Sequence, residues 1–213
     1  MQPYSNRRER ALTAFHGGVA IVPAARAILR NGDSTFPFRQ NSDFYYLTGF
    51  DEPDCVLVLA PHHEHRSVLF LRERDRTQEI WNGKRLGVEN AREALGVDEA
   101  HPIGELPQRL ADYLVGATSL HYAFGADAPT DRIVHDALQA AREKVRRKGR
   151  APQKVVEPEL ALEPMRLIKD DAELAILRRA AAITRRGHVA AMRATRPGLY
   201  EYEIQAILEA EYR

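Results

Sequence analysis

Three histidines in one short segment are the first candidates for chemistry in this sequence. His62, His63 and His65 lie between two apolar runs, and imidazole nitrogens are common zinc ligands. Zinc motifs such as HExxH hold their ligands on a helix that fixes the geometry, and neither that spacing nor a nearby carboxylate pair is present. We therefore favour the alternative that the three histidines occupy a solvated hairpin loop.

A basic run near the middle of the chain is a second candidate. Residues 144–150 read KVRRKGR, a pattern that can bind phosphate groups. The run also follows a predicted helix, where cations complement the helix dipole. The formal net charge of the chain is only +1. This balance favours the helix-end interpretation and predicts no nucleic-acid partner.

The common catalytic motifs are missing. No GxSxG, P-loop or GxGxxG pattern occurs. Cys55, the single cysteine, lies in the apolar run CVLVL and is predicted to be a buried thiol, which makes it a poor nucleophile. If the protein belongs to an enzyme, its chemistry is expected beyond Arg213.

Asp33 and Trp81 are candidates for binding a ligand. Asp33 lies in the turn-like stretch Asn31–Ser34, where an aspartate normally caps its own turn. The alternative is that its carboxylate faces the amine of a ligand. Trp81 is the only tryptophan, and it precedes Asn82-Gly83, a strong turn signal followed by two cations. A short strand is expected to end there. A lone tryptophan usually lies in a core, so the position of Trp81 beside a charged turn stays open at this point.

These candidates need elements to position them, and the first 160 residues alternate between strand and helix patterns. Strands are predicted at 19–22, 44–47, 55–59, 67–71, 79–81 and 121–124, with an extended piece at 155–156. Helices are predicted at 5–15, 88–95, 103–114 and 131–148. We therefore expect an α/β domain over residues 1–160, with a mixed sheet flanked by helices.

The pattern changes around Pro158–Pro164. Asp170 reads as a helix N-cap with Glu173 three residues later, which predicts a helix to about Ala194. A second helix is predicted from about Tyr200. Two amphipathic helices need a partner for their apolar faces, so residues 161–213 are expected to be a linker and the beginning of an incomplete second domain.

The composition is that of an ordinary globular chain, with 44% hydrophobic and 29% charged residues. No apolar run approaches the roughly 20 residues of a membrane helix, and the basic N-terminus lacks the apolar segment of a secretory signal. A single cysteine favours a reducing compartment. We expect a soluble, cytoplasmic protein without a membrane partner.

Four stretches together resemble a known family. They are FPFRQNSDFYYLTGF at 36–50, Glu52-Pro53, RDRTQEIWNGKRLG at 74–87, and MRLIK at 165–169 followed by ELAILRRA at 173–180. Over nearly the whole chain the sequence resembles the bacterial Xaa-Pro aminopeptidases, also called aminopeptidase P. The resemblance implies a creatinase-type N-terminal domain followed by a truncated pita-bread peptidase domain.

The resemblance also implies an activity. Such enzymes release an N-terminal residue that precedes proline, with two bridged divalent metal ions, typically manganese, that activate a hydroxide. Two aspartates, one histidine and two glutamates hold the metals, and all five belong to the C-terminal domain beyond Arg213. The chain alone is therefore expected to bind no metal and to be catalytically inert.

The family further implies roles for three residues. Members assemble as dimers or tetramers, and the Trp81 loop of one copy reaches over the cleft of another, so Trp81 is expected to be partly exposed at the surface of a single copy. Asp33 matches a loop aspartate near the substrate entrance, and Arg150 matches a basic position near the last helix of the N-terminal domain. Three alternatives remain: a prolidase or creatinase relative, a non-catalytic pita-bread binding module, and a complete chain that pairs with a separate C-terminal catalytic polypeptide.

Overall fold

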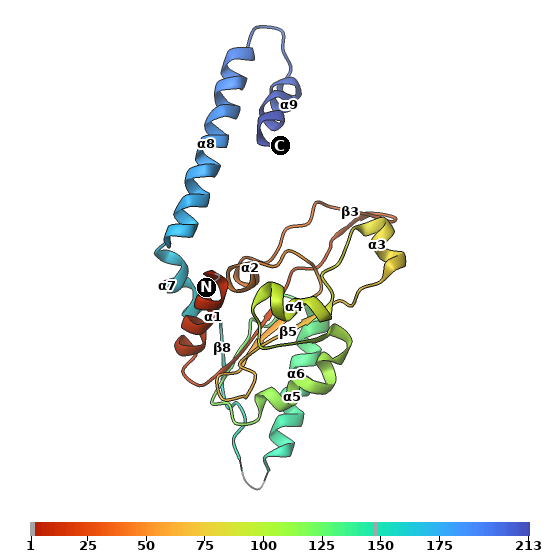
Figure 1. Cartoon of the computed structure of the whole chain (residues 1–213), viewed down its shortest axis with the longest axis vertical. Coiled ribbons are helices and arrows are strands. Elements are labelled where there is room, and N and C mark those ends of the chain that lie inside the picture. The colour runs from red at the N-terminus through yellow and green to blue at the C-terminus, as the bar shows by residue number, and fades with distance from the viewer. Residues whose placement is uncertain (1–2, 147–148) are drawn as a thin grey trace. The chain divides into compact units, whose positions relative to one another are not determined.

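The computed structural model describes residues 3–146 and 149–213, which divide into two compact units. The first unit is Met1–Met165 and the second is Arg166–Arg213. Figure 1 shows a sheet flanked by helices in the first unit and a helix pair in the second. A mixed α/β fold with a sheet flanked by helices is thus confirmed.

A six-stranded sheet, in the order β6-β5-β4-β1-β7-β8, forms the centre of the first unit. β4 pairs antiparallel with β1 and β5, whereas the β1–β7, β5–β6 and β7–β8 pairs are parallel. A separate hairpin is formed by β2 and β3. The strands are β1 Val19–Pro23, β2 Leu29–Asn31, β3 Ser34–Thr35, β4 Val56–Leu59, β5 Ser67–Leu71, β6 Glu99–Pro102, β7 Leu120–His121 and β8 Val155–Val156.

Helices cover both faces of this sheet, which explains why its central strands are apolar throughout. Successive side chains of a strand point to opposite faces, so Val56 and Val58 enter one core and Leu57 and Leu59 the other. The first core packs against α5 and α6, and the second against α1, α2 and α4. The helices of this unit are α1 Pro3–Ala14, α2 Ser42–Thr48, α3 Arg76–Asn82, α4 Val88–Leu95, the 3-10 turn η1 Ile103–Glu105, α5 Leu106–Leu114, α6 Ala128–Lys144 and α7 Glu159–Leu167, which crosses the boundary.

Arg8 joins two helix ends in the second of these cores. Its side chain is 2% exposed. Its guanidinium donates to the carbonyl of Leu47 at the end of α2, at 2.9 Å, and to the carbonyls of Leu95 and Gly96 at the end of α4. The last carbonyls of a helix have no partner within the helix, so one cation satisfies both termini.

Two predicted strands are helices instead. Residues 44–47 belong to α2, because the Asn41 side chain accepts from the amides of Asp43 and Phe44 and Gly49 ends the helix in the left-handed conformation at φ 66°. Residues 79–81 belong to α3, capped by Asp75 in the same way. In both cases the caps outweigh the strand propensity of the aromatic residues.

Other boundaries moved less. The strand predicted at 121–124 is only Leu120–His121, and the helix predicted from 131 begins at Ala128 with Asp127 as its N-cap. The helix ends earlier than predicted, at Lys144. Residue 148, the predicted end, lies outside the described residues. The apolar face of α6 places Val134 and Ala137 in the core. α7, β2, β3 and β6 were not predicted.

The second unit consists of the end of α7, then α8 Asp171–Ala194 and α9 Glu201–Tyr212. The predicted capping box at the start of α8 is confirmed: the Glu173 amide donates to the Asp170 side chain at 2.8 Å and the Asp170 amide to the Glu173 carboxylate at 3.0 Å. α8 and α9 pack together where Gly187 faces the ring of Tyr212.

Candidate functional site

The most exposed large apolar side chains of the first unit lie on α3. Trp81 is 83% exposed and Ile80 77%. None of the residues of α3 is buried. The predicted surface position of Trp81 is confirmed, but the turn is different: Asn82-Gly83 ends a helix, with Gly83 at φ 84° and its amide bonded to the Glu79 carbonyl. Two such side chains exposed together are typical of an interaction surface.

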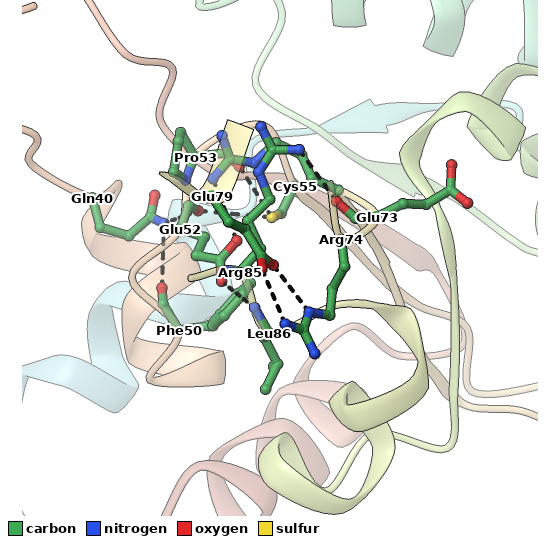
Figure 2. Close-up of polar contacts among 11 residues, drawn as sticks. Gln40, Phe50, Glu52, Pro53, Cys55, Glu73, Arg74, Glu79, Arg85 and Leu86 are labelled. Carbon is green, nitrogen blue, oxygen red and sulfur yellow. Dashed lines mark hydrogen bonds and ion pairs between the residues drawn. The ribbon is translucent and has the colours of Figure 1, made fainter. Parts of the chain in front are cut away.

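Glu79 connects α3 to the chain segments on either side of it. Its Oε1 accepts from Arg74 Nε and its Oε2 from Arg74 Nη2, both at 3.0 Å. Oε1 also accepts from the amide of Arg85 at 3.2 Å. The hydrogen bonds from Arg74, followed by that from Arg85, hold the pKa of the Glu79 carboxyl at about 2. The carboxylate is therefore charged at neutral pH, and it joins the segment before α3 to the segment after it (Figure 2).

Glu52, in the segment before β4, contacts the chain both before and after α3. Its Oε1 accepts from the Leu86 amide at 2.7 Å, and its Oε2 lies 3.3 Å from Arg72 Nη2. Arg85 Nη1 donates back to the Glu73 carbonyl at 3.2 Å. We call residues 72–87, which include α3, the α3 loop. These contacts join the two ends of the α3 loop to each other and to the segment 50–55, as Figure 2 shows.

Gln40 and Cys55 stabilise that segment from inside. Gln40, which is buried, donates through Nε2 to the carbonyls of Phe50 and Glu52 at 3.2 and 2.9 Å. The Cys55 thiol lies 3.3 Å from the Pro53 carbonyl, and burial raises its pKa to about 12. The prediction of a buried thiol is thus confirmed, and the raised pKa disfavours the thiolate form.

The segments that carry Asp33 and Trp81 leave the sheet at the same edge, the one at which β1 and β5 end. β1 and β5 point in the same direction because each is antiparallel to β4. The chain leaves β1 toward the β2–β3 hairpin, whose exposed turn carries Asp33, and it leaves β5 toward α3. Figure 1 shows β3 and α3 at one end of the first unit. Asp33 thus lies in the predicted turn, exposed to solvent.

Arg150 lies at the opposite edge of the sheet, the one at which β1, β7 and β8 begin. It precedes β8, which is parallel to β7 and β1. Its carbonyl accepts from the amide of Gly116 at 2.6 Å, in the connection that leads into β7. Arg150 comes after α6 in the chain and is exposed. The fold therefore does not bring Arg150 together with Trp81 and Asp33 in one copy of the chain.

The histidine loop is the predicted connection between β4 and β5. His62 Nε2 lies 2.8 Å from the Val115 carbonyl, and His63 Nδ1 accepts from the His65 amide at 3.1 Å. Within residues 3–146 and 149–213, no group of three or more histidine, cysteine or acidic side chains could hold a metal ion. The described part of the chain therefore does not fit a two-metal centre.

The basic run is divided by the structure. Lys144 Nζ pairs with Asp112 Oδ1 at 2.5 Å, and Gly149 and Arg150 follow in the loop before β8. Arg147 and Lys148, which the sequence places in the same run, lie outside the described residues.

In the described parts of the chain no helix is both long and apolar enough to cross a bilayer.

A groove of about 540 Å³ opens at the same edge of the sheet as the hairpin and α3. Its walls come from the end of β1 and the residues after it, from the segments that follow β7 and β8, and from the segment 37–43. Arg26 and Asp127, which border it, are paired at 2.7 Å between Nε and Oδ1. The sequence did not predict the groove, because its walls come from segments far apart in the chain.

Comparisons with known proteins agree with this arrangement. The family described as "Aminopeptidase P, N-terminal domain" matches residues 4–129. The chain therefore belongs to the aminopeptidase P family.

Among its relatives, the Xaa-Pro aminopeptidase of Escherichia coli is 41% identical over 99% of this chain and 48% of the relative, and that of Haemophilus influenzae is 38% identical over 99% and 47%. A solved structure described as zinc-substituted E. coli aminopeptidase P in complex with product matches with a TM-score of 0.90 at 41% identity, over 99% of this chain and 49% of that one. Pseudomonas aeruginosa aminopeptidase PepP matches with a TM-score of 0.90 at 38% identity, over the same shares. The chain spans about half the length of these relatives.

Proposed function

We propose that this chain is the N-terminal portion of a metal-dependent Xaa-Pro aminopeptidase, which releases an N-terminal residue that precedes proline. The family membership and the names of the relatives support this activity. Since the described residues offer no metal site, the divalent ions, which we propose to be manganese, would be held by a part of the protein outside this chain. On this proposal the chain alone is inert.

The contribution of this chain is a cover for the peptide site. The observation that carries this role is the exposure of Trp81 on a helix that buries no apolar side chain in its own unit. An indole presents a large, rigid apolar surface. Placed over a proline-containing peptide, it would exclude water and bind the proline ring, which has no amide N–H to pair.

We propose that the covered cleft belongs to another copy of the chain, within a dimer or tetramer. An exposed apolar set supports this. Ile28 and Leu29, 67% and 69% exposed, lie on the hairpin that leaves the same edge of the sheet as α3. Several large apolar side chains exposed at one end of a domain are typical of an interaction surface.

Asp33 and Arg150 would act separately. The exposed carboxylate of Asp33 suits the ammonium group of a peptide substrate or an arginine of the cleft, at the same edge as Trp81. Arg150 lies at the other edge, so any contact of Arg150 with the same substrate would come from a different copy. The buried, unpaired Cys55 is consistent with the cytoplasm as the compartment.

A peptidase assay tests the proposal. The full-length protein that carries this chain should cleave Xaa-Pro peptides and leave Xaa-Ala peptides intact, and a chelator should abolish the activity. The 213-residue chain alone should release no product even with added Mn²⁺. Turnover by the 213-residue chain, or a full-length protein that binds peptides without cleaving them, would contradict the proposal; the second result would favour a non-catalytic binding module.

A further inference from the structure

We propose that Glu79 is the positioning residue of Trp81: its carboxylate sets the orientation in which α3 presents the indole. The inference rests on the proposed function of Trp81 as a cover. Glu79 does not itself reach the substrate, and its side chain is the one that α3 does not expose.

Apolar packing does not orient α3. None of its seven residues is buried, and its two large apolar side chains, Ile80 and Trp81, point into solvent. A helix of this length is not stable through its own hydrogen bonds. Its orientation therefore depends on the caps at its ends and on polar contacts to the rest of the unit.

Glu79 makes the polar contacts that reach both sides of α3. Its side chain is only 9% exposed, which is unusual on this helix. Arg74, before the helix, donates two hydrogen bonds at 3.0 Å, and the Arg85 amide, after the helix, donates a third at 3.2 Å. A bidentate pair between arginine and a carboxylate fixes direction as well as distance. One carboxylate thus holds the beginning and the end of the loop together.

The helical repeat then directs Trp81 outward. Successive residues of an α-helix are rotated by about 100°, so a side chain two positions after Glu79 is turned by about 200°. With Glu79 facing Arg74 and Arg85, Trp81 has to face away from the unit, as its exposure shows.

Arg74 is itself held in place. A Cβ atom on Gly87 would lie 2.5 Å from Arg74 Cγ, so the arginine stem packs directly on the glycine backbone. Gly87 also has a φ of 77°, which favours glycine. The close approach fixes the start of the arginine stem beside Gly87, on the side from which the guanidinium meets Glu79.

The contacts of Glu52 separate positioning from folding. Glu52 ties the Leu86 amide to the 50–55 segment at 2.7 Å without using Glu79. The base of the loop should stay closed when Glu79 is changed, and only α3 above it should lose its fixed orientation.

Nuclear magnetic resonance of the 213-residue chain tests this inference, with E79Q as the variant and E73Q as its matched control. Glu73 is exposed and contributes its carbonyl to Arg85, while its carboxylate points away from the network in Figure 2. Because Trp81 is the only tryptophan, its indole N–H gives one assigned signal.

We expect E79Q to lower the order parameters of the Trp81 and Asn82 amides below about 0.6, the range of flexible backbone. Exchange of the Arg85 amide should accelerate about tenfold, as its charged acceptor is lost. The thermal midpoint should stay close to that of the wild type, and E73Q should change none of these values. Unchanged order parameters and exchange in E79Q would overturn the inference, and so would global unfolding of E79Q, since Glu79 would then be a folding residue.

Kinetics of the full-length protein distinguish this inference from the proposed function. If W81A lowers kcat/KM for an Xaa-Pro peptide, E79Q should lower it in the same direction by raising KM. An effect of W81A without any effect of E79Q refutes the positioning role and leaves the proposed function standing. An absence of effect in W81A refutes the cover, while the resonance measurements still decide whether Glu79 orients α3.

Discussion

Replacing Arg8 with methionine should destabilise the first unit strongly. The guanidinium is buried, and it donates to three carbonyls at the ends of α2 and α4. These two helices flank the segments that carry the 50–55 loop and α3. Methionine keeps most of the apolar stem but cannot donate, so the variant isolates the loss of the hydrogen bonds.

The magnitude follows from the surroundings of the three carbonyls. An unsatisfied buried acceptor costs about 1–3 kcal/mol. The Leu47 carbonyl is in a buried contact and should incur this cost in full, whereas the contacts of Leu95 and Gly96 are partly buried and water can replace part of each. Against this, methionine avoids the cost of burying a charge, which lowers the pKa of Arg8. We expect a net loss of about 2–4 kcal/mol.

Urea unfolding measured by circular dichroism gives this number, with R10M as the matched control. Arg10 lies on the same helix two residues later and is exposed, so R10M should change the free energy of unfolding by less than about 0.5 kcal/mol. If R8M is as stable as R10M, the carbonyls at the ends of α2 and α4 do not depend on Arg8, and this account of the second core is wrong.

Two further predictions concern other parts of the first unit. Burial lowers the pKa of His121, so the folded state favours the neutral ring; stability should fall as the pH decreases below the ordinary histidine value of about 6.5, and H121Q should flatten this acid limb in unfolding curves recorded between about pH 7 and 5. A persistent limb in H121Q would exclude His121 as its cause. G49A should cost about 1–3 kcal/mol, because Gly49 ends α2 at φ 66° and a Cβ there would lie 2.3 Å from the Tyr4 ring; a midpoint equal to that of the wild type would contradict this packing.

The sequence predicted the parts of the fold where burial follows a simple period. The central strands at 19–22, 55–59 and 67–71 are buried on both faces and read as continuous apolar runs. α6 and α8 are long enough for their apolar spacing or caps to be unambiguous. A mixed sheet flanked by helices could therefore be predicted from residue patterns alone.

Short elements were the ones that sequence patterns could not resolve. FYYL and EIW have strand-like compositions, but Asn41 and Asp75 cap them as helices of seven residues each. Both caps were visible in the sequence as Asx residues followed by a glycine eight positions later. β6, with the sequence EAHP, has no apolar run because it lies at the edge of the sheet.

For the candidate site, the sequence predicted an exposed Trp81 but not the reason for its exposure. That expectation came from the resemblance to a family and not from the local pattern, because a lone tryptophan more often lies in a core. Glu79 was overlooked because its partners, Arg74 and Arg85, contact it only once the loop is closed. No simple spacing rule marks this pair, because Arg74 lies before the helix and five residues from Glu79, whereas helical pairs are three or four residues apart.

The kcat/KM of W81A in the full-length protein tests the central claim most directly. A tryptophan side chain offers about 150–250 Å², and Trp81 is 83% exposed. If the peptide covers about half of this surface, at about 25 cal/mol per Å², the contact contributes about 1.5–2.5 kcal/mol. We therefore predict that W81A lowers kcat/KM for an Xaa-Pro peptide by about 10- to 70-fold while the thermal midpoint stays unchanged. A kcat/KM within about twofold of the wild type would contradict the proposal that this chain covers the peptide site.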